Sequence, residues 1–349
     1  RLKRLHSSLK KPSVVLFIGA GTVDKTARLF SAICRCKSNP GREWMEYLKP
    51  NVTPDSRLKL DETLHNKTTL KIGGKAKFYA EPGTLEDLLQ IQESAALFGM
   101  PHYILGRGSN LIVPKQGFPG VVLRLNRPYW RNVERIGGGR IRVGSGVRLV
   151  EVAKQTCSMG LSGFEFMEGI PGAIGGALRM NAGAMGSWIL DLVEEISVMD
   201  AQGKLETLRK KDFLAGYRRC QGLNGRMVLT AVLKSPRSDD SERIRSRMLS
   251  FAKRRRATQP RESSAGCVFR NPEGYYAGQL IEEAGLKGER VRSAEVSRVH
   301  GNFIVNRGNA RYGDVIELVR LVRKQVRKAF NLELVPEVEL LGLNWETEL

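Results

Sequence analysis

Apolar residues along the chain recur with helical spacing in some stretches and with strand spacing in others. Asp314–Phe330 is the clearest helix, because its apolar residues return every three or four positions and share one stripe. Thr84–Phe98 has the same spacing. Lys75–Ala80 and Leu332–Leu341 alternate apolar and polar residues instead, which predicts a strand in each.

Shorter segments complete the pattern. The charged segment Ser238–Arg256 reads as a helix and as a natural domain boundary, whereas the proline-bearing residues 37–60 read as a linker. Further helices are expected at Leu149–Met159 and Gly278–Ala284. Further strands are expected at Tyr103–Leu105, Leu111–Val113, Val121–Leu125, Ile141–Gly144, Glu195–Met199, Lys204–Leu208, Met227–Leu233 and Phe303–Val305.

One stretch, Gly169–Gly186, fits neither spacing. Glycine fills six of its positions, and most of the others carry small side chains. Such a stretch packs poorly in a core but lets the backbone approach a ligand closely. Its free N–H groups suit phosphate, so we expect a diphosphate against this loop, with a tight packing corner as the alternative.

The charge balance favours anionic partners. The net charge is +21 and the pI is about 10.0, which suits nucleic acid, an anionic membrane or phosphorylated small molecules. The sharpest basic clusters, Arg1–Lys11 and Arg254–Arg256, are not interleaved with aromatic residues as a single-strand binding surface would be. No apolar run approaches the length of a membrane span.

Cysteine and histidine usage argues against structural metal and disulfides. The five cysteines have no zinc-finger spacing, so free thiols in a reducing, cytoplasmic setting are the simplest interpretation. The four histidines are scattered, and no metal site is expected.

The first fifty residues differ from the rest. A basic start leads to an apolar strand, Val14–Ile18, then to Gly19–Gly21 and an expected helix, Val23–Cys34. This strand, turn and helix resemble the end of the C-terminal domain of the Mur ligases. The resemblance implies a fusion to an upstream ligase, and a basic targeting or tail segment is the alternative.

Eight motifs in register carry a second, broader resemblance. Their order and spacing are similar to those of the UDP-N-acetylenolpyruvoylglucosamine reductase (MurB) family, in its compact type II form, over roughly residues 60–343. The motifs are TTLKIGGKA, GRGSNLIV, GIPGAIGGALRMNAGAMG, GYRRC, TQPRESSAGCVFRNP, AGQLIEEAGLKG, EVSRVHGNFIVN and VPEVELLG.

The resemblance implies an α+β fold in three parts. Residues 1–50 would be an N-terminal extension, 60–237 an FAD-binding PCMH-type (vanillyl-alcohol-oxidase-like) domain of two subdomains, and 238–349 an α+β substrate-binding domain. The implied activity is NADPH-dependent reduction of the enolpyruvyl ether of UDP-N-acetylglucosamine to UDP-N-acetylmuramate, in cytoplasmic peptidoglycan precursor synthesis. FAD would be bound without a covalent link.

The resemblance also implies which residues hold the cofactor. Two glycine-bearing loops would converge on the FAD pyrophosphate, where larger side chains would block the approach of the backbone. The residues concerned are Gly106, Arg107, Gly108, Ser109, Asn110, Gly169, Pro171, Gly172, Gly175, Gly176, Asn181 and Gly183.

Three residues match the catalytic positions of the family. Cys267 stands where the family places its proton donor, usually serine, and a buried structural cysteine is the alternative. Arg218 matches the arginine that holds the enolate or carboxylate, and a solvated surface arginine is the alternative. Glu337 matches the C-terminal glutamate, and an exposed strand carboxylate is the alternative.

Four further residues match positions that contact the UDP-sugar. They are Tyr217, Asn271, Lys287 and His300, of which Lys287 would meet the diphosphate as a point charge and His300 could equally be a structural histidine. Two other functions stay open at this point. One is a basic nucleic-acid-binding protein, and the other is a flavin oxidase of the same superfold with another substrate.

Overall fold

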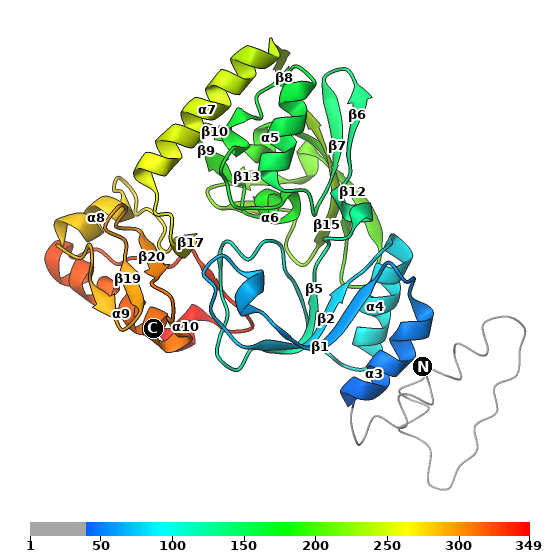
Figure 1. The fold of residues 1–349 in the computed structure, drawn as a ribbon, viewed down its shortest axis with the longest axis horizontal. Coiled ribbons are helices and arrows are strands. Elements are labelled where there is room, and N and C mark those ends of the chain that lie inside the picture. Colours follow the sequence, from blue (N-terminus) through cyan, green and yellow to red (C-terminus); the bar gives the residue numbers. More distant parts are fainter. Residues whose placement is uncertain (1–39) are drawn as a thin grey trace, which may run out of the picture.

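The computed structural model describes residues 40–349, with side chains from Arg42 onward. They form three lobes in chain order (Figure 1). Helix α7 (Ser241–Thr258) leads from the second lobe to the third, and Glu339–Leu340 then pair with a strand of the first lobe before the chain ends on the third lobe. The expected strand Val14–Ile18 and helix Val23–Cys34 lie outside the described residues.

The first lobe is a mixed sheet covered by two helices. Its strand order is β1-β2-β5-β3, with β2, β5 and β3 parallel and β1 antiparallel to β2. Thr84 caps helix α4 by accepting a hydrogen bond from the N–H of Asp87. The elements are α3 (Pro40–Leu48), β1 (Arg57–Thr63), β2 (Lys75–Glu81), α4 (Leu85–Leu97), β3 (His102–Ile104), β4 (Leu111–Ile112) and β5 (Phe118–Leu123).

The linker expected at residues 37–60 is wrong for its described part. Residues 40–48 form helix α3, and Trp44 and Leu48 are fully buried in the core of the first lobe. The Trp44 ring meets Phe78 of the sheet edge-on at 5.0 Å, and its Nε1–H donates to Ser94 Oγ at 2.9 Å. Proline at Pro40 was read as a linker signal, although proline is well tolerated at the start of a helix.

This packing makes α3 part of the stable unit. We expect Trp44→Ala to lower the free energy of unfolding by about 3–5 kcal/mol, since it removes a large buried ring and a buried hydrogen bond. Glu46→Ala on the exposed face of the same helix should change it by no more than about 0.5 kcal/mol. Urea unfolding of both variants checks this, and equal small effects would show that α3 is not integral to the lobe.

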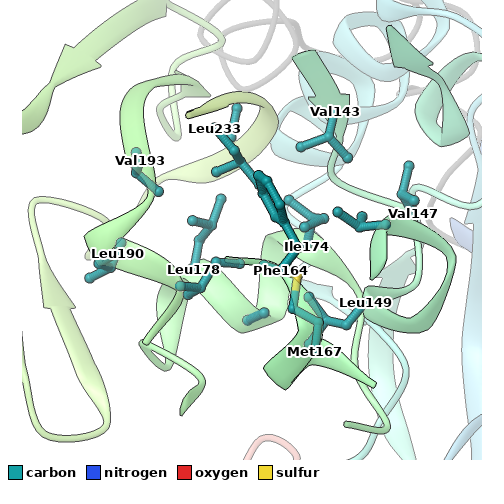
Figure 2. Packing of buried hydrophobic residues seen from close by; sticks show 14 of the residues in the cluster. Val143, Val147, Leu149, Phe164, Met167, Ile174, Leu178, Leu190, Val193 and Leu233 are labelled. Carbon is teal, nitrogen blue, oxygen red and sulfur yellow. The ribbon is translucent and has the colours of Figure 1, made fainter. Parts of the chain in front are cut away.

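The second lobe is built on an antiparallel sheet with strand order β12-β11-β15-β7-β6. Helices α5, α6 and α7 and the loops between them add core residues, and Figure 2 shows Ile174 and Leu178 of α6 beside Phe164 and Met167. The elements are β6 (Val133–Gly137), β7 (Arg140–Gly144), α5 (Leu149–Ser158), β8 (Leu161–Ser162), α6 (Ile174–Arg179), β9 (Gly183–Ala184), β10 (Ser187–Trp188), β11 (Val193–Met199), β12 (Leu205–Arg209), β13 (Leu214–Gly216), β14 (Arg219–Gln221), β15 (Met227–Lys234), β16 (Arg237–Ser238) and α7 (Ser241–Thr258).

The third lobe packs two helices on a four-stranded antiparallel sheet with strand order β17-β20-β19-β18. Helix α9 presents the predicted valine stripe to this core and ends at Asn331, whose φ of 54° is left-handed. The elements are β17 (Ser263–Cys267), α8 (Ala277–Glu283), β18 (Arg290–Val291), β19 (Ala294–Val296), β20 (Phe303–Asn306), α9 (Tyr312–Phe330), β21 (Glu339–Leu340) and α10 (Trp345–Glu348).

The continuous strand expected at Leu332–Leu341 is wrong. Only Glu339–Leu340 forms a strand, β21, which pairs in parallel with β4 of the first lobe. The residues before it bond instead to the third lobe, where the Val335 carbonyl accepts from the N–H of Arg270. This segment changes partners midway and contains Pro336, which has no N–H to donate, so no single ladder can form. Within residues 40–349 the other expected helices and strands are present with ends shifted by a few residues.

Candidate active site

The hairpin β13–β14 carries Arg218 at its tip. Gly216 pairs with Arg219, so Tyr217 and Arg218 form a two-residue turn. Arg218 has a φ of 56°, a left-handed conformation that costs a non-glycine residue roughly 1–2 kcal/mol. A strained arginine at an exposed turn therefore needs a compensating contact.

That contact is an ion pair with Glu337. Arg218 Nε lies 2.7 Å from Glu337 Oε1, and the two side chains are only 27% and 6% exposed. Burial raises the pKa of Glu337, whereas Arg218 and Arg270 act to lower it. Glu337 Oε2 is buried and has no hydrogen-bond partner among residues 40–349. The carboxylate is therefore held by one close ion pair, in which Arg218 Nε does not meet hydrogen-bond geometry, and it keeps one oxygen for another molecule.

The alternation expected around Glu337 is present. Leu334 and Val338 point into the third-lobe core, while Val335, on the same side as Glu337, is 52% exposed. Glu337 is buried because the Arg218 hairpin covers that side of the segment. An exposed strand carboxylate and a solvated surface arginine are thus both the wrong interpretations for these two residues.

Cys267 ends strand β17 beside this pair. The pairing of β17 with β20 is irregular between Ser264 and Cys267, and such bulges redirect the side chains that follow them. Burial, and then Glu337, raise the pKa of the Cys267 thiol to about 11, although Arg218 and Arg255 act to lower it. The thiol therefore keeps its proton at neutral pH within range of two cationic groups.

Arg255 and Glu168 belong to the same cluster, and the sequence interpretation missed both. Arg255 Nε is buried without a hydrogen-bond partner in the described part of the chain. Its charge acts on Arg218 and Cys267, and Glu168 opposes the lowering of the Arg255 pKa that burial causes. The signal was helical spacing, since Arg255 continues the inward stripe of Met248 on α7 while the neighbouring arginines are exposed.

Tyr217 and Asn271 lie at the edge of this cluster. Tyr217 is 55% exposed, and the Arg218 guanidinium carbon lies 5.5 Å from the centre of its ring. Burial of part of the ring, and then Glu337, raise the pKa of Tyr217, and the Asn271 backbone acts on its hydroxyl. The Asn271 side-chain oxygen accepts from the N–H of Ala277, which leaves its amide N–H groups to meet a ligand.

Lys287 and His300 form a second group, around helix α8. Lys287 Nζ lies 2.6 Å from Glu282 Oε2. His300 Nδ1 accepts from the N–H of Asn302, and burial followed by the charge of Lys287 lowers the pKa of His300. A Cβ on Gly278 would lie 2.9 Å from His300 Cε1, so glycine is what admits the ring. One nitrogen of His300 is thus structural, and the neutral ring sits beside an ammonium group.

The loop Gly106–Asn110 divides into packing residues and open ones. A Cβ on Gly108 would lie 2.9 Å from backbone atoms of Lys67 and Thr68, so this glycine allows two loops to touch. A Cβ on Gly106 would meet nothing within 4 Å. Ser109 lies beside β17, since a Cβ on Gly266 would come within 3.6 Å of its carbonyl. Gly106 is therefore the glycine of this loop that faces free space.

The glycine stretch is not a simple loop, because it contains helix α6. The N–H groups of Ile174 and Gly175 donate to the carbonyls of Val147 and Ser145, so the chain itself uses part of the expected phosphate cradle. A Cβ on Gly175 would lie 3.2 Å from Ser145 Cβ, whereas one on Gly176 would meet nothing within 4 Å. Close packing therefore accounts for Gly175, whereas Gly176 leaves room for another molecule.

The remaining positions of the stretch mainly serve packing. A Cβ on Gly183 would lie 2.3 Å from the Trp188 ring, and one on Gly169 would lie 2.9 Å from Arg255 Cδ. Gly172 has ordinary contact with Leu149, and Pro171 is exposed. Asn181 is buried and joins the stretch to the Arg218 hairpin, since its amide donates to the Gly216 carbonyl at 3.3 Å.

The surroundings of the two open glycines suit a dinucleotide diphosphate. Ser145 Oγ is buried, lies next to α6 and has no hydrogen-bond partner among the described residues. The pKa of Arg107 is lowered by burial and then by three other arginines, Arg148, Arg124 and Arg131. Glu151 pairs with Arg131 and Arg148 and partly offsets this effect on Arg107, but one carboxylate among four arginines leaves a surplus of positive charge that an anion would relieve.

Across residues 40–349 no cluster of histidine, cysteine or acidic residues is arranged to hold a metal ion. None of the helices in that range is long and apolar enough to cross a membrane.

Comparisons with known proteins agree with this geometry. Residues 76–209 match the FAD binding domain model, and residues 259–341 match the model described as UDP-N-acetylenolpyruvoylglucosamine reductase, C-terminal domain. The chain is 36% identical over 290 residues to the UDP-N-acetylenolpyruvoylglucosamine reductase of Syntrophomonas wolfei, with 83% of this chain and 96% of the relative covered. It is 40% identical over 302 residues to UDP-N-acetylenolpyruvoylglucosamine reductase 2 of Symbiobacterium thermophilum, covering 86% and 97% respectively.

A solved structure extends the comparison to the fold. The crystal structure of UDP-N-acetylenolpyruvylglucosamine reductase from Thermus caldophilus is 36% identical and superposes with a TM-score of 0.71. The match covers 82% of this chain and 99% of that one. The α+β fold expected from the motifs, with an FAD-binding domain followed by a separate C-terminal domain, is confirmed.

Proposed function

The chain belongs to the UDP-N-acetylenolpyruvoylglucosamine reductase family, and we propose that it reduces UDP-N-acetyl-3-O-(1-carboxyvinyl)-glucosamine to UDP-N-acetylmuramate with NADPH. The observation that carries this proposal is the buried Arg218–Glu337 ion pair beside the protonated thiol of Cys267. FAD, when bound, supplies the hydride that it has taken from NADPH. The product would enter peptidoglycan precursor synthesis.

Arg218 would supply the positive charge that the first step of the reaction, hydride addition, requires. Hydride addition to the terminal carbon of the enolpyruvyl group leaves negative charge on the adjacent carbon and on the carboxylate attached to it. A guanidinium stays cationic and can hold carboxylate or enolate oxygens through paired N–H groups. The left-handed turn brings Arg218 to this position, and Glu337 fixes it there.

Cys267 supports the second need, a proton for the adjacent carbon. Its thiol is protonated at neutral pH, yet it is a far stronger acid than the serine hydroxyl that the family usually places there. As the proton leaves, Arg218 and Arg255 stabilise the thiolate that forms. Glu337 is assigned to the carboxylate side of the substrate, where its free oxygen Oε2 can accept or share a proton.

The cofactor assignment rests on the open glycines. Gly106 and Gly176 would face the FAD pyrophosphate, with Ser145 Oγ and the Arg107 guanidinium as polar partners. Gly108, Gly169, Gly172, Gly175 and Gly183 would support these loops by allowing close packing. Ser109, Pro171 and Asn181 remain proposed cofactor-side residues on the same segments.

Substitution of Gly106 tests this cofactor site without straining the protein. The backbone of Gly106 does not have a positive φ, and a Cβ there would meet no protein atom within 4 Å. Gly106→Val should therefore fold with unchanged stability. Its FAD occupancy after purification should fall at least tenfold, because the added methyl groups occupy ligand space. Gly313→Ala, also with open Cβ space, is the matched control. Full flavin absorbance in Gly106→Val would exclude the assignment.

The substrate residues are proposed in two groups. Tyr217 and Asn271 lie beside the catalytic cluster and would contact the sugar end of the substrate. Lys287 would meet the diphosphate once it leaves Glu282, and the free nitrogen of His300 would lie next to it. NADPH would approach the same FAD in a separate half-reaction, before the enolpyruvyl substrate is reduced.

The domain limits, location and fusion are also proposals. We place the FAD-binding domain at 60–237, with α3 packed onto it, and the substrate-binding domain at 238–349. The family matches lie inside these limits. NADPH, a UDP-sugar and free thiols suit the cytoplasm. The resemblance of residues 14–34 to a ligase end supports a fusion to an upstream Mur ligase, which the coding sequence before Arg1 would test.

The activity is tested by product identification. Purified protein incubated with NADPH and the enolpyruvyl UDP-sugar should consume NADPH only when both are present and should form UDP-N-acetylmuramate, detected by mass spectrometry. NADPH consumption without that product would reject this substrate, and a protein that takes up no FAD would reject the whole proposal.

A further inference from the structure

We propose that Asn110 is a positioning residue for the catalytic Glu337 and that it ties the cofactor loop to the catalytic carboxylate. The proposal rests on the proposed function and deepens it. The sequence assigned Asn110 to the cofactor, but its side-chain amide contacts the backbone of Glu337.

The contacts of Asn110 reach two segments that are distant from it in the sequence. Its side-chain Nδ2–H donates to the backbone carbonyl of Glu337 at 3.2 Å. Its backbone carbonyl accepts from the N–H of Glu339 at 3.0 Å. Nδ2 also lies 4.0 Å from the sulfur of Met180, at the end of α6. Asn110 thus stands between the cofactor loop, the glycine stretch and the segment that carries Glu337.

The peptide groups of Glu337 are held from two lobes. The N–H of Glu337 donates to the Val268 carbonyl at 2.7 Å, next to Cys267 in the third lobe. Its carbonyl accepts from Asn110 of the first lobe. Asn110 of the first lobe and Val268 of the third lobe, next to Cys267, therefore hold the two peptide groups of Glu337, and we call these two hydrogen bonds the clamp.

This clamp matters because little else directs the carboxylate. Of the two Glu337 oxygens, Oε1 pairs with Arg218, and Oε2 has no hydrogen-bond partner among the described residues. Arg218 itself sits on a narrow hairpin in a strained conformation. A carboxylate held at one point by such a partner depends on its own backbone for its position. A misplacement of about 1 Å costs on the order of a hundredfold in rate.

The cofactor loop, Gly106–Asn110, also links the clamp to the proposed cofactor site. Gly106, which opens into the space proposed for the FAD pyrophosphate, lies on the same short loop as Asn110. The same short loop therefore faces the proposed cofactor space at Gly106 and holds the backbone of Glu337 at Asn110.

Two variants of the FAD-loaded enzyme test the role. Asn110→Leu keeps the volume and removes the N–H donors, and Asn110→Ala removes the side chain in case leucine does not fit. In anaerobic rapid mixing, NADPH should bleach the flavin at the wild-type rate in both. Recovery of the flavin absorbance on adding the enolpyruvyl UDP-sugar should be tenfold to a hundredfold slower, with little change in the substrate concentration for half-maximal rate. Asn331→Gly, at the end of α9, is the control and should match wild type.

A double-mutant cycle with Glu337→Gln separates positioning through Glu337 from other effects. If Asn110 acts through Glu337, Asn110→Leu should slow the Glu337→Gln enzyme far less than it slows wild type. Equal slowing in both backgrounds would overturn the proposal, as would loss of FAD or slower bleaching by NADPH. If wild-type enzyme itself shows no recovery with the enolpyruvyl sugar, the proposed function fails, and the result then does not concern Asn110.

Discussion

Cys267→Ala is expected to retain FAD and normal bleaching of the flavin by NADPH but to lose turnover of the enolpyruvyl substrate by about a hundredfold or more. Proton transfer from a positioned side chain typically contributes a factor of about 10²–10⁴, and alanine has no proton to give. Cys267 is partly buried at the end of β17, so the loss of its sulfur leaves the neighbouring strands intact.

Two further variants define the role of the thiol. Cys267→Ser should keep appreciable activity, because a hydroxyl can occupy the place and the family usually has serine there. Cys157→Ala, which removes a buried thiol on α5, should behave as wild type. Near-normal turnover by Cys267→Ala would refute the proton-donor role, and a dead serine variant would show that the site depends on sulfur.

The pH dependence of the same step gives an independent check. The folded-state pKa of Cys267 is raised to about 11, so the thiol is protonated at every lower pH. Loss of the donor with rising pH should therefore set in only near that value. A fall in the substrate step centred near 8.5, the ordinary value for a thiol, would contradict the raised pKa.

Arg218→Ala should have the second large effect, a loss of about 10²–10³ in turnover. The reason is that it removes the cation aimed at the developing negative charge, and removal of one such stabilising group typically costs this much. It also leaves Glu337 buried without its ion-pair partner, which raises the pKa of that carboxyl further. Lysine at the same position keeps the charge without the paired N–H groups and should recover part of the rate.

Arg219 offers the matched control on the same hairpin. It is exposed and follows Arg218 directly, so Arg219→Ala removes a like charge without touching Glu337. Steady-state kinetics with all three variants would show the difference. Similar losses for Arg218→Ala and Arg219→Ala would mean that overall charge, and not the Arg218–Glu337 pair, matters.

The sequence predicted site residues best where function requires particular residue types within a short motif. The motifs around Arg218, Cys267 and Glu337 marked the three side chains that the fold brings together. It could not show that Glu337 is buried, because the burial comes from the Arg218 hairpin, which lies far away in the chain. It also could not show why Arg218 tolerates a left-handed backbone, since the compensating ion pair is a tertiary contact.

Local signals misled in two places. Pro40 and its neighbours were read as a linker, yet Trp44 finds a pocket against Phe78 that only the folded sheet provides. Arg255 was predicted only as part of the basic cluster Arg254–Arg256, although helical spacing turns it inward toward Cys267. For the glycine stretch Gly169–Gly186 the sequence offered two interpretations and could not assign either to a particular glycine. Only the fold distinguishes glycines that face free space from those that allow close packing.

The central claim is tested most directly by one anaerobic experiment on the wild-type enzyme. The FAD-loaded protein is bleached with one equivalent of NADPH and then mixed with the enolpyruvyl UDP-sugar. We predict rapid recovery of the flavin absorbance together with one equivalent of UDP-N-acetylmuramate. Bleaching that persists in the presence of the enolpyruvyl sugar would contradict the assignment of Arg218, Cys267 and Glu337 to this reaction.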